Sequence, residues 1–135
     1  MLRRFRFTVG IAVLAALTVR LAYAEELQGY SGAQLYQRFC ASCHGAHAEG
    51  NGPVAAFFKI MPPNLTQLAR RNGGQFPAEG VRKSIDGRAD IRPHGTREMP
   101  VWGLEFAAAT GTTGQADGMT LVDRLVDYLR SIQLP

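Results

Sequence analysis

The stretch Cys40-Ala41-Ser42-Cys43-His44 decides how the rest of this chain is interpreted. Two cysteines three positions apart, with a histidine directly after the second, form the attachment signature of c-type haem. In that chemistry the two thiols add to the vinyl groups of the porphyrin and become thioethers. The histidine gives its imidazole to the iron as the proximal ligand. The pattern therefore predicts one haem c, covalently attached through Cys40 and Cys43, with His44 as an iron ligand.

Two other interpretations of the cysteine pair have less support. A redox-active dithiol is expected in a strand–helix–strand setting, and no such pattern surrounds the pair. A zinc site needs more donors than the only two cysteines, and His44 and His47 do not provide the C-x2-C…H-x3-5-H spacing. Because a histidine follows the pair directly and an export signal precedes it, haem attachment is favoured.

The N-terminal segment has the organisation of a secretory signal. Three arginines within the first six residues precede an apolar run over residues 8–19, shorter than the roughly 20 residues that span a bilayer. The small-x-small tripeptide at residues 22–24 then provides a cleavage site. We therefore expect residues 1–24 to be a cleaved signal peptide and residues 25–135 to form one domain in the periplasm. An uncleaved N-terminal anchor is the alternative.

The charge balance gives no support for two classes of partner, nucleic acid and acidic lipid. The chain has 15 Lys and Arg against 11 Asp and Glu, a formal net charge of +4. The excess comes from four arginines of the N-terminal segment: Arg3, Arg4, Arg6 and Arg20. Residues 25–135 carry equal numbers of basic and acidic side chains, so they give no support for binding nucleic acid or an acidic lipid surface. We expect a membrane to be approached only through a redox partner or an uncleaved anchor.

Helical patterns, without any alternating strand of useful length, predict an all-α domain. The predicted helices cover residues 31–40, 64–74, 77–86 and 119–132. Capping patterns begin the first two at Ser31 and Asn64, and Pro77 suits the first position of the third. The last helix, beginning near Met119 or Thr120, shows apolar residues at helical spacing, which is the strongest such signal in the chain.

The remaining segments are predicted to be loops. Residues 87–100 are polar and lack periodicity, and residues 109–118 are rich in Gly and Thr, which is typical of a surface loop. Between them, residues 101–106 form a short apolar segment. The expected domain is therefore helical with long loops.

A low-spin haem needs a second axial ligand on the face opposite His44. Met99 is the leading candidate, because it lies in a loop far along the chain and Pro100 keeps it extended. His94 and Met61 are alternatives, and an open sixth site is another. His47 is too close to His44 in sequence to reach the far face.

Taken together, these residues resemble a class I monohaem cytochrome c over nearly all of residues 25–135. The motifs that carry the resemblance are Cys40-x-x-Cys43-His44-Gly45, Gly52-Pro53, Pro63-Asn64-Leu65, Met99-Pro100-x-Trp102-Gly103, and terminal helices with Gly32, Tyr36 and Tyr128. The resemblance implies an all-α, cytochrome c-like fold of about four to five helices, with long loops wrapped around one covalently attached haem.

The resemblance also implies roles for particular residues around the cofactor. Pro53 would accept, through its carbonyl, the proton on the other nitrogen of His44. Met99 would be the distal ligand, and Trp102 would form a wall of the haem site, although plain core burial is an equal explanation for a lone tryptophan.

Further positions would support the fold and the propionates. Gly32 and Tyr36 would pack against the last helix near Leu125 and Tyr128. One arginine among Arg88, Arg92 and Arg97 would neutralise a haem propionate, while the default for each is a solvated surface charge.

The function implied is electron transfer without catalysis by the chain itself. His/Met ligation raises the haem potential relative to His/His and leaves no iron site for oxygen. Donor and acceptor proteins would dock weakly over a small interface. Alternatives are the electron-transfer subunit of a larger oxidoreductase, or a haem sensor or peroxidase-like protein with an open sixth site.

Overall fold

The computed structural model describes residues 15–16, 18–19, 24–88, 99–111 and 115–135. Most of the expected signal segment lies outside these ranges, as do three residues considered above: Arg92, His94 and Arg97. No helix within the described ranges is both long and apolar enough to cross a membrane.

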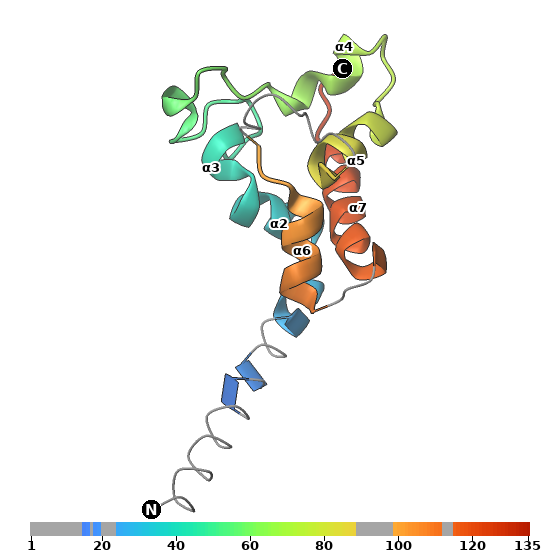
Figure 1. Cartoon of the computed structure of the whole chain (residues 1–135). Coiled ribbons are helices and arrows are strands. Elements are labelled where there is room, and N and C mark those ends of the chain that lie inside the picture. Colours follow the sequence, from blue (N-terminus) through green and yellow to red (C-terminus); the bar gives the residue numbers. More distant parts are fainter. Residues whose placement is uncertain (1–14, 17, 20–23, 89–98, 112–114) are drawn as a thin grey trace, which may run out of the picture.

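The described part of the chain is helical, as expected, and contains no strand. The longer helices are α2 (Gly32–Phe39), α5 (Ala78–Asp86), α6 (Trp102–Thr110) and α7 (Gln115–Ser131). Four single turns complete the fold: α3 (Ala41–His44), η1 (Ala55–Phe57), η2 (Leu65–Gln67) and α4 (Leu68–Arg71). Residues 24–29 are also helical. Helix α7 contacts α2, α5 and α6, while the short turns gather at the upper end of the molecule (Figure 1).

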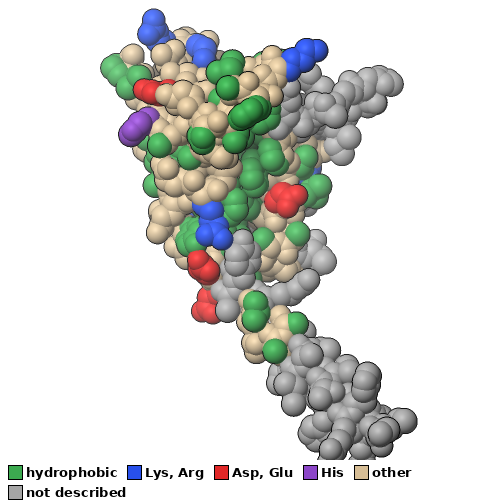
Figure 2. All heavy atoms as spheres, turned by 90° about the vertical axis from the view of Figure 1, so that its left-hand side faces the viewer, with side chains coloured by type: hydrophobic (Ala, Val, Ile, Leu, Met, Phe, Trp, Pro, Cys, Tyr) green, Lys and Arg blue, Asp and Glu red, His purple; other side chains and the backbone are tan. Residues whose placement is uncertain are grey.

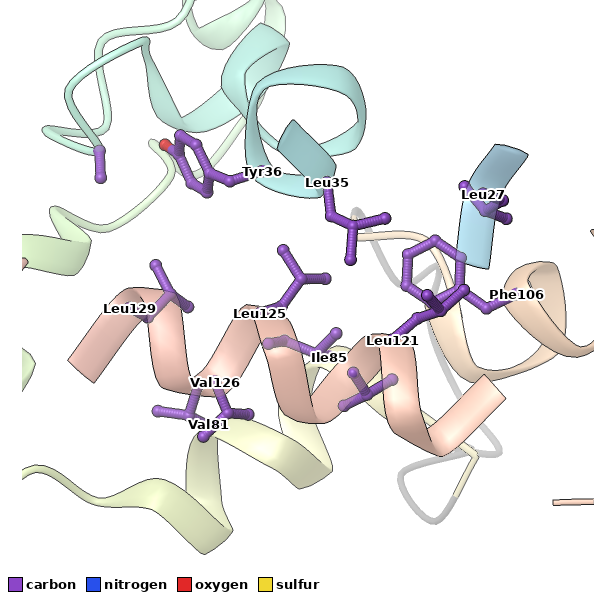
Figure 3. Packing of buried hydrophobic residues seen from close by; sticks show 12 residues of the cluster. Leu27, Leu35, Tyr36, Val81, Ile85, Phe106, Leu121, Leu125, Val126 and Leu129 are labelled. Carbon is purple, nitrogen blue, oxygen red and sulfur yellow. The ribbon is translucent and has the colours of Figure 1, made fainter. Parts of the chain in front are cut away.

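One apolar cluster joins the longer helices around α7 (Figure 3). Helix α7 contributes its buried stripe, which consists of Leu121, Val122, Leu125, Val126 and Leu129. Opposite these residues lie Leu35 and Tyr36 of α2, Val81 and Ile85 of α5, and Phe106 of α6. Each fully buried side chain of this size contributes about 1.5–3 kcal/mol relative to exposure, so this cluster is the main source of stability.

The crossing of α2 and α7 depends on the absence of a side chain at Gly32. A Cβ there would overlap the carbonyl oxygen of Arg124 and lie only 2.8 Å from the Cβ of Tyr128. Next to this point the rings of Tyr36 and Tyr128 stand 5.3 Å apart. The expected packing of Gly32 and Tyr36 on the last helix is therefore confirmed.

Capping patterns in the sequence predicted several helix ends correctly. The capping box of α2 forms in both directions, with Gln34 N–H 3.3 Å from Ser31 Oγ and Ser31 N–H 2.8 Å from Gln34 Oε1. Helix α5 follows Pro77 directly and ends at Gly87, whose φ of 70° suits a residue without a Cβ.

The second predicted helix is shorter and less regular than expected. The side chain of Asn64 does cap it, accepting the Thr66 N–H at 2.9 Å. However, residues 65–67 form a 3₁₀ turn and only residues 68–71 are α-helical, and the Leu65 N–H donates to the distant carbonyl of Ala48 at 2.7 Å.

The prediction for residues 101–118 was partly wrong. The apolar segment is the start of a full helix, α6, which continues to Thr110, and α7 begins at Gln115 rather than near Met119 or Thr120. At Gly118 a Cβ would lie 3.2 Å from the backbone nitrogen of Ala107, so α6 and α7 approach each other closely there. This tertiary contact outweighs the low helix propensity of glycine.

Candidate functional site

The Cys-x-x-Cys-His stretch folds as one helical turn at the end of α2. Cys40 caps α2, and its carbonyl accepts the N–H of Cys43 at 3.2 Å and the N–H of His44 at 2.9 Å. Cys40 and Cys43 are both partly exposed free thiols. A single turn of helix therefore holds two unpaired thiols and an imidazole, the three donors that attach a haem c.

The electrostatic environment of Cys40 does not suit a redox dithiol. Burial, and to a smaller extent the neighbouring Cys43, raises the pKa of its thiol to about 12. Reactive disulfide-exchange cysteines have a lowered pKa, because the thiolate is the attacking species. The Cys40 thiol stays protonated at neutral pH, so the dithiol interpretation loses support.

His44 is buried, with 9 % of its surface exposed, and is held by one backbone contact. Its Nδ1 lies 3.2 Å from the carbonyl oxygen of Pro63. Because a carbonyl only accepts, this contact places the ring proton on Nδ1 and leaves Nε2 as the free donor atom. Burial lowers the pKa of His44, and the Pro63 contact opposes this more weakly. The neutral imidazole that an iron ligand requires is therefore the favoured form.

The expected partner of His44, Pro53, was wrong. The structure places Pro53 on the exposed outer side of the loop, and Pro63 takes the role. The reason is the path of the backbone after His44. The N–H of Gly52 donates to Cys43 O at 3.1 Å and that of Val54 to Ser42 O at 3.1 Å, so Pro53 stays along the outside of α3.

A second set of contacts then brings Pro63 to the imidazole. The N–H of Leu65 donates to Ala48 O at 2.7 Å, and Gly50 lies so close to Pro62 and Pro63 that a Cβ on it would overlap their backbone. The chain thus returns to His44 ten residues after it has passed Pro53. The sequence signal was Pro62-Pro63, an extended pair directly before the cap residue Asn64.

Trp102 lies beside the end of α2, and Met99 packs against the same apolar cluster. The Trp102 ring lies 5.5 Å from that of Phe39, the residue before Cys40, and 5.7 Å from that of Phe106. Phe39, Cys40, Met99 and Trp102 are all partly buried, and all pack against the same apolar cluster. Figure 2 shows the face that lies on the left in Figure 1, where hydrophobic side chains extend down the middle of the domain.

The other methionines and His47 are placed differently. Met61 is exposed, so it does not fill a gap in the core. Met119 accepts a contact from Arg88, whose Nη2 lies 3.2 Å from its sulfur. His47 is exposed in the loop that follows α3. Among these methionines Met99 is the one that packs, partly buried, against the apolar cluster, which Trp102 also contacts.

Arg88 is not a solvated surface charge. Its guanidinium pairs with the carboxylate of Asp86 at 2.7 Å, and both side chains are largely buried. A Cβ at Gly103 would lie 2.8 Å from Cγ of Asp86 and 2.9 Å from Nε of Arg88. This ion pair is therefore packed against the first turn of α6, and Arg88 is engaged there through Asp86 and Met119.

The donor set of the described residues fits a haem c. No group of three or more His, Cys, Asp or Glu side chains in these ranges is arranged to hold a metal ion. What the site offers instead is two thiols, one neutral imidazole with its tautomer set by Pro63, and an apolar surface that includes a thioether. These groups suit a large apolar macrocycle attached through thioethers better than a free cation.

Comparison with known proteins gives one result for most of the chain. Residues 30–133 match the family model described as Cytochrome c. No curated protein and no solved structure matches the chain.

Proposed function

The chain belongs to the cytochrome c family, and from that premise we propose that it carries single electrons between redox proteins in the periplasm on a His/Met-ligated haem c. Members of this family are typically electron carriers. The observation that supports the proposal most directly is the contact between His44 Nδ1 and the Pro63 carbonyl, which leaves Nε2 as a neutral donor one residue after two free thiols.

Each residue of the site has a distinct task in this proposal. Cys40 and Cys43 would hold the porphyrin covalently, and His44 would bind the iron. Haem c, when bound, supplies a one-electron Fe(III)/Fe(II) couple. The carbonyl of Pro63 makes the imidazole more basic, because it stabilises positive charge on the ring.

Met99 and Trp102 would complete the haem site on the face opposite His44. A thioether is a soft ligand that favours ferrous iron, so Met99 would raise the potential relative to a second imidazole. The Trp102 ring packs on Phe39 and Phe106. These three rings would keep water away from the distal face of the haem. With both axial positions filled, the iron would change oxidation state with little rearrangement and would not bind oxygen.

Haem attachment is tested with Cys40→Ser and Cys43→Ser. Each variant should weaken or abolish haem staining in a denaturing gel, since one thioether is lost. A matched control is Ser42→Ala, which changes the neighbouring exposed residue and should retain the haem. Full retention of haem in both cysteine variants would contradict the proposal.

The distal ligand is tested with Met99→Ala against Met61→Ala. We expect the methionine-to-iron charge-transfer band of the ferric protein to disappear only in the Met99 variant, because Met61 is exposed. A wild-type ferrous protein that readily binds carbon monoxide would rule out a filled sixth site. The compartment is tested by fractionating the cells and sequencing the N-terminus of the periplasmic protein, which should begin at Glu25.

A further inference from the structure

The ion pair between Asp86 and Arg88 joins two helices directly. Asp86 is the last residue of α5, and Gly87, with a φ of 70°, turns the chain so that the Arg88 side chain meets it. Both Nε and Nη2 of Arg88 lie 2.7 Å from Oδ1 of Asp86, and Nη2 lies 3.2 Å from the sulfur of Met119 on α7. The two side chains are only 15 % and 25 % exposed, so this is not a surface ion pair.

A third helix, α6, packs its first turn against the same ion pair. A Cβ on Gly103 would overlap Oδ1 of Asp86 and would lie 2.9 Å from Nε of Arg88. Gly103 is buried, and α5 contacts both α6 and α7. The pair therefore fixes where the first turn of α6 stands relative to the other two helices.

The residues before this turn, which we call the 99–103 segment, connect it to Met99. Val101 already belongs to the start of α6, because its carbonyl accepts the N–H of Leu104 at 3.0 Å. Only Pro100 then separates Met99 from the helix, and the proline ring fixes its own φ near about −65°. Since the 99–103 segment is short and stiff, the position of Met99 follows that of the first turn of α6.

Stability alone is a poor explanation for a buried ion pair. Removing two charges from water costs free energy that their mutual attraction only partly returns. What such a pair provides is one preferred arrangement of the groups around it, because each charge is costly once it is separated from its partner. A second pair on α5 is of the more ordinary kind. Arg82 lies 2.7 Å from Asp123 of α7, but these side chains are 34 % and 46 % exposed.

We propose that the Asp86–Arg88 pair positions the distal ligand: it holds Met99 on the haem iron through the first turn of α6. The inference rests on the proposed function, and it names the residues that determine how firmly the sixth position is filled. An external ligand binds the iron only in the fraction of molecules in which Met99 has left it, so its apparent affinity rises with that fraction. Weakening the pair should therefore raise the affinity for an external ligand.

The test measures the binding of imidazole to the ferric holoprotein, followed by the loss of the methionine-to-iron charge-transfer band. It is made at about pH 8, where imidazole is mainly uncharged, because the variants change the charge of the protein. Arg88→Leu removes the pair. Arg88→Lys keeps the charge but loses the guanidinium fork that reaches both Asp86 and Met119. The matched control is Arg82→Leu, which removes an equal charge and an ion pair from the same helix.

The proposal predicts a graded response. Arg88→Leu should bind imidazole roughly tenfold more tightly than the wild type, and Arg88→Lys about threefold more tightly. Asp86→Asn breaks the pair from its other side and should act in the same direction. Arg82→Leu should change the affinity less than about twofold, even where urea denaturation shows that it lowers the stability of the holoprotein as much as Arg88→Leu does.

Two results would overturn the positioning role. One is an imidazole affinity that is the same in the wild type, Arg88→Lys and Asp86→Asn, the two variants that decide the matter if Arg88→Leu does not fold. The other is an equal gain of affinity in Arg82→Leu, because the effect would then follow general stability.

Met99→Ala separates this inference from the proposed function. If Met99→Ala loses the charge-transfer band while the Asp86 and Arg88 variants bind imidazole as the wild type does, only the positioning role fails. A Met99→Ala protein that keeps the band removes the proposed ligation as well.

Discussion

Two regions of this molecule are built on different physical principles. Around α7, side chains from four helices form an apolar cluster whose stability comes from area removed from water. In the segment from Cys40 to Thr66 there is little regular structure, and the path of the chain is set by backbone hydrogen bonds such as Gly50 N–H to His44 O at 2.8 Å.

The difference explains where function can be placed. A packed cluster tolerates few changes but specifies only the fold. The 40–66 segment places particular carbonyl groups at particular points, and one of them, that of Pro63, reaches the imidazole of His44. The two regions meet at Phe39 and Tyr36 on α2, so the stable cluster serves as the base on which the irregular segment is held.

The strongest way to break the clustered region is Gly32→Ala. The new Cβ would overlap the backbone of α7 at Arg124, so the helices must separate, and we expect a loss of about 3 kcal/mol in the free energy of unfolding. Urea denaturation of the holoprotein measures it. The control is Gly80→Ala, where a Cβ meets nothing within 4 Å and should stabilise α5 by up to about 1 kcal/mol. Equal effects of the two changes would contradict the close crossing.

Replacing Gln133 tests the connection between the two regions. Its Oε1 accepts the Ala69 N–H at 2.8 Å, and its Nε2 donates to Leu65 O at 2.8 Å and Leu129 O at 2.7 Å. Gln133→Met keeps the size and removes these bonds, so we expect a loss of about 2 kcal/mol. Because Leu65 is two residues after Pro63, the absorption spectrum of the haem should also shift. Gln37→Met, which removes a single exposed contact to Ala46 O, should do neither.

Gly52→Ala probes the irregular segment itself. A Cβ there would stand 2.6 Å from the carbonyl carbon of Cys43, but the loop is exposed on its outer side and can move away. We expect a loss of only about 1–2 kcal/mol in unfolding free energy, together with reduced covalent haem in a stained denaturing gel. Gly29→Ala, which meets nothing within 4 Å, should retain full staining. A Gly52 variant with normal haem content would show that this close approach does not matter for attachment.

The smallest effect is expected from Tyr36→Phe at the boundary between the regions. The buried hydroxyl donates to Gly45 O at 2.6 Å, so its removal should cost about 1 kcal/mol of unfolding free energy.

The same residue predicts a pH dependence of stability, because burial, chiefly, raises the pKa of Tyr36 in the folded state. The protonated tyrosine is therefore favoured by folding, and its contribution is complete below the unfolded pKa of about 10 and is lost as pH rises through and beyond that value. Urea titrations at alkaline pH should show a shallower decline for Tyr36→Phe than for the wild type; equal declines would contradict this.

Most of the helical fold could be predicted because its signals are local. The capping box at Ser31, the glycine that ends α5 and the apolar stripe of α7 depend on residues a few positions apart, where spacing alone carries the information. The start of α7 could not be predicted in this way, since Gly118 disfavours a helix locally, whereas its close approach to Ala107 is a contact between two helices.

The same distinction between local signals and tertiary contacts applies to the candidate site. The sequence by itself determined the grouping of Cys40, Cys43 and His44, because one turn of helix places them together wherever the turn lies. The carbonyl that orients His44 was decided only by tertiary structure, because Pro53 and Pro63 both follow the histidine, and the family resemblance implied the nearer one. The farther proline is selected by backbone contacts, Val54 to Ser42 and Leu65 to Ala48, that fold the intervening chain back on itself. Hydrogen bonds between distant backbone groups leave no periodic trace in a sequence.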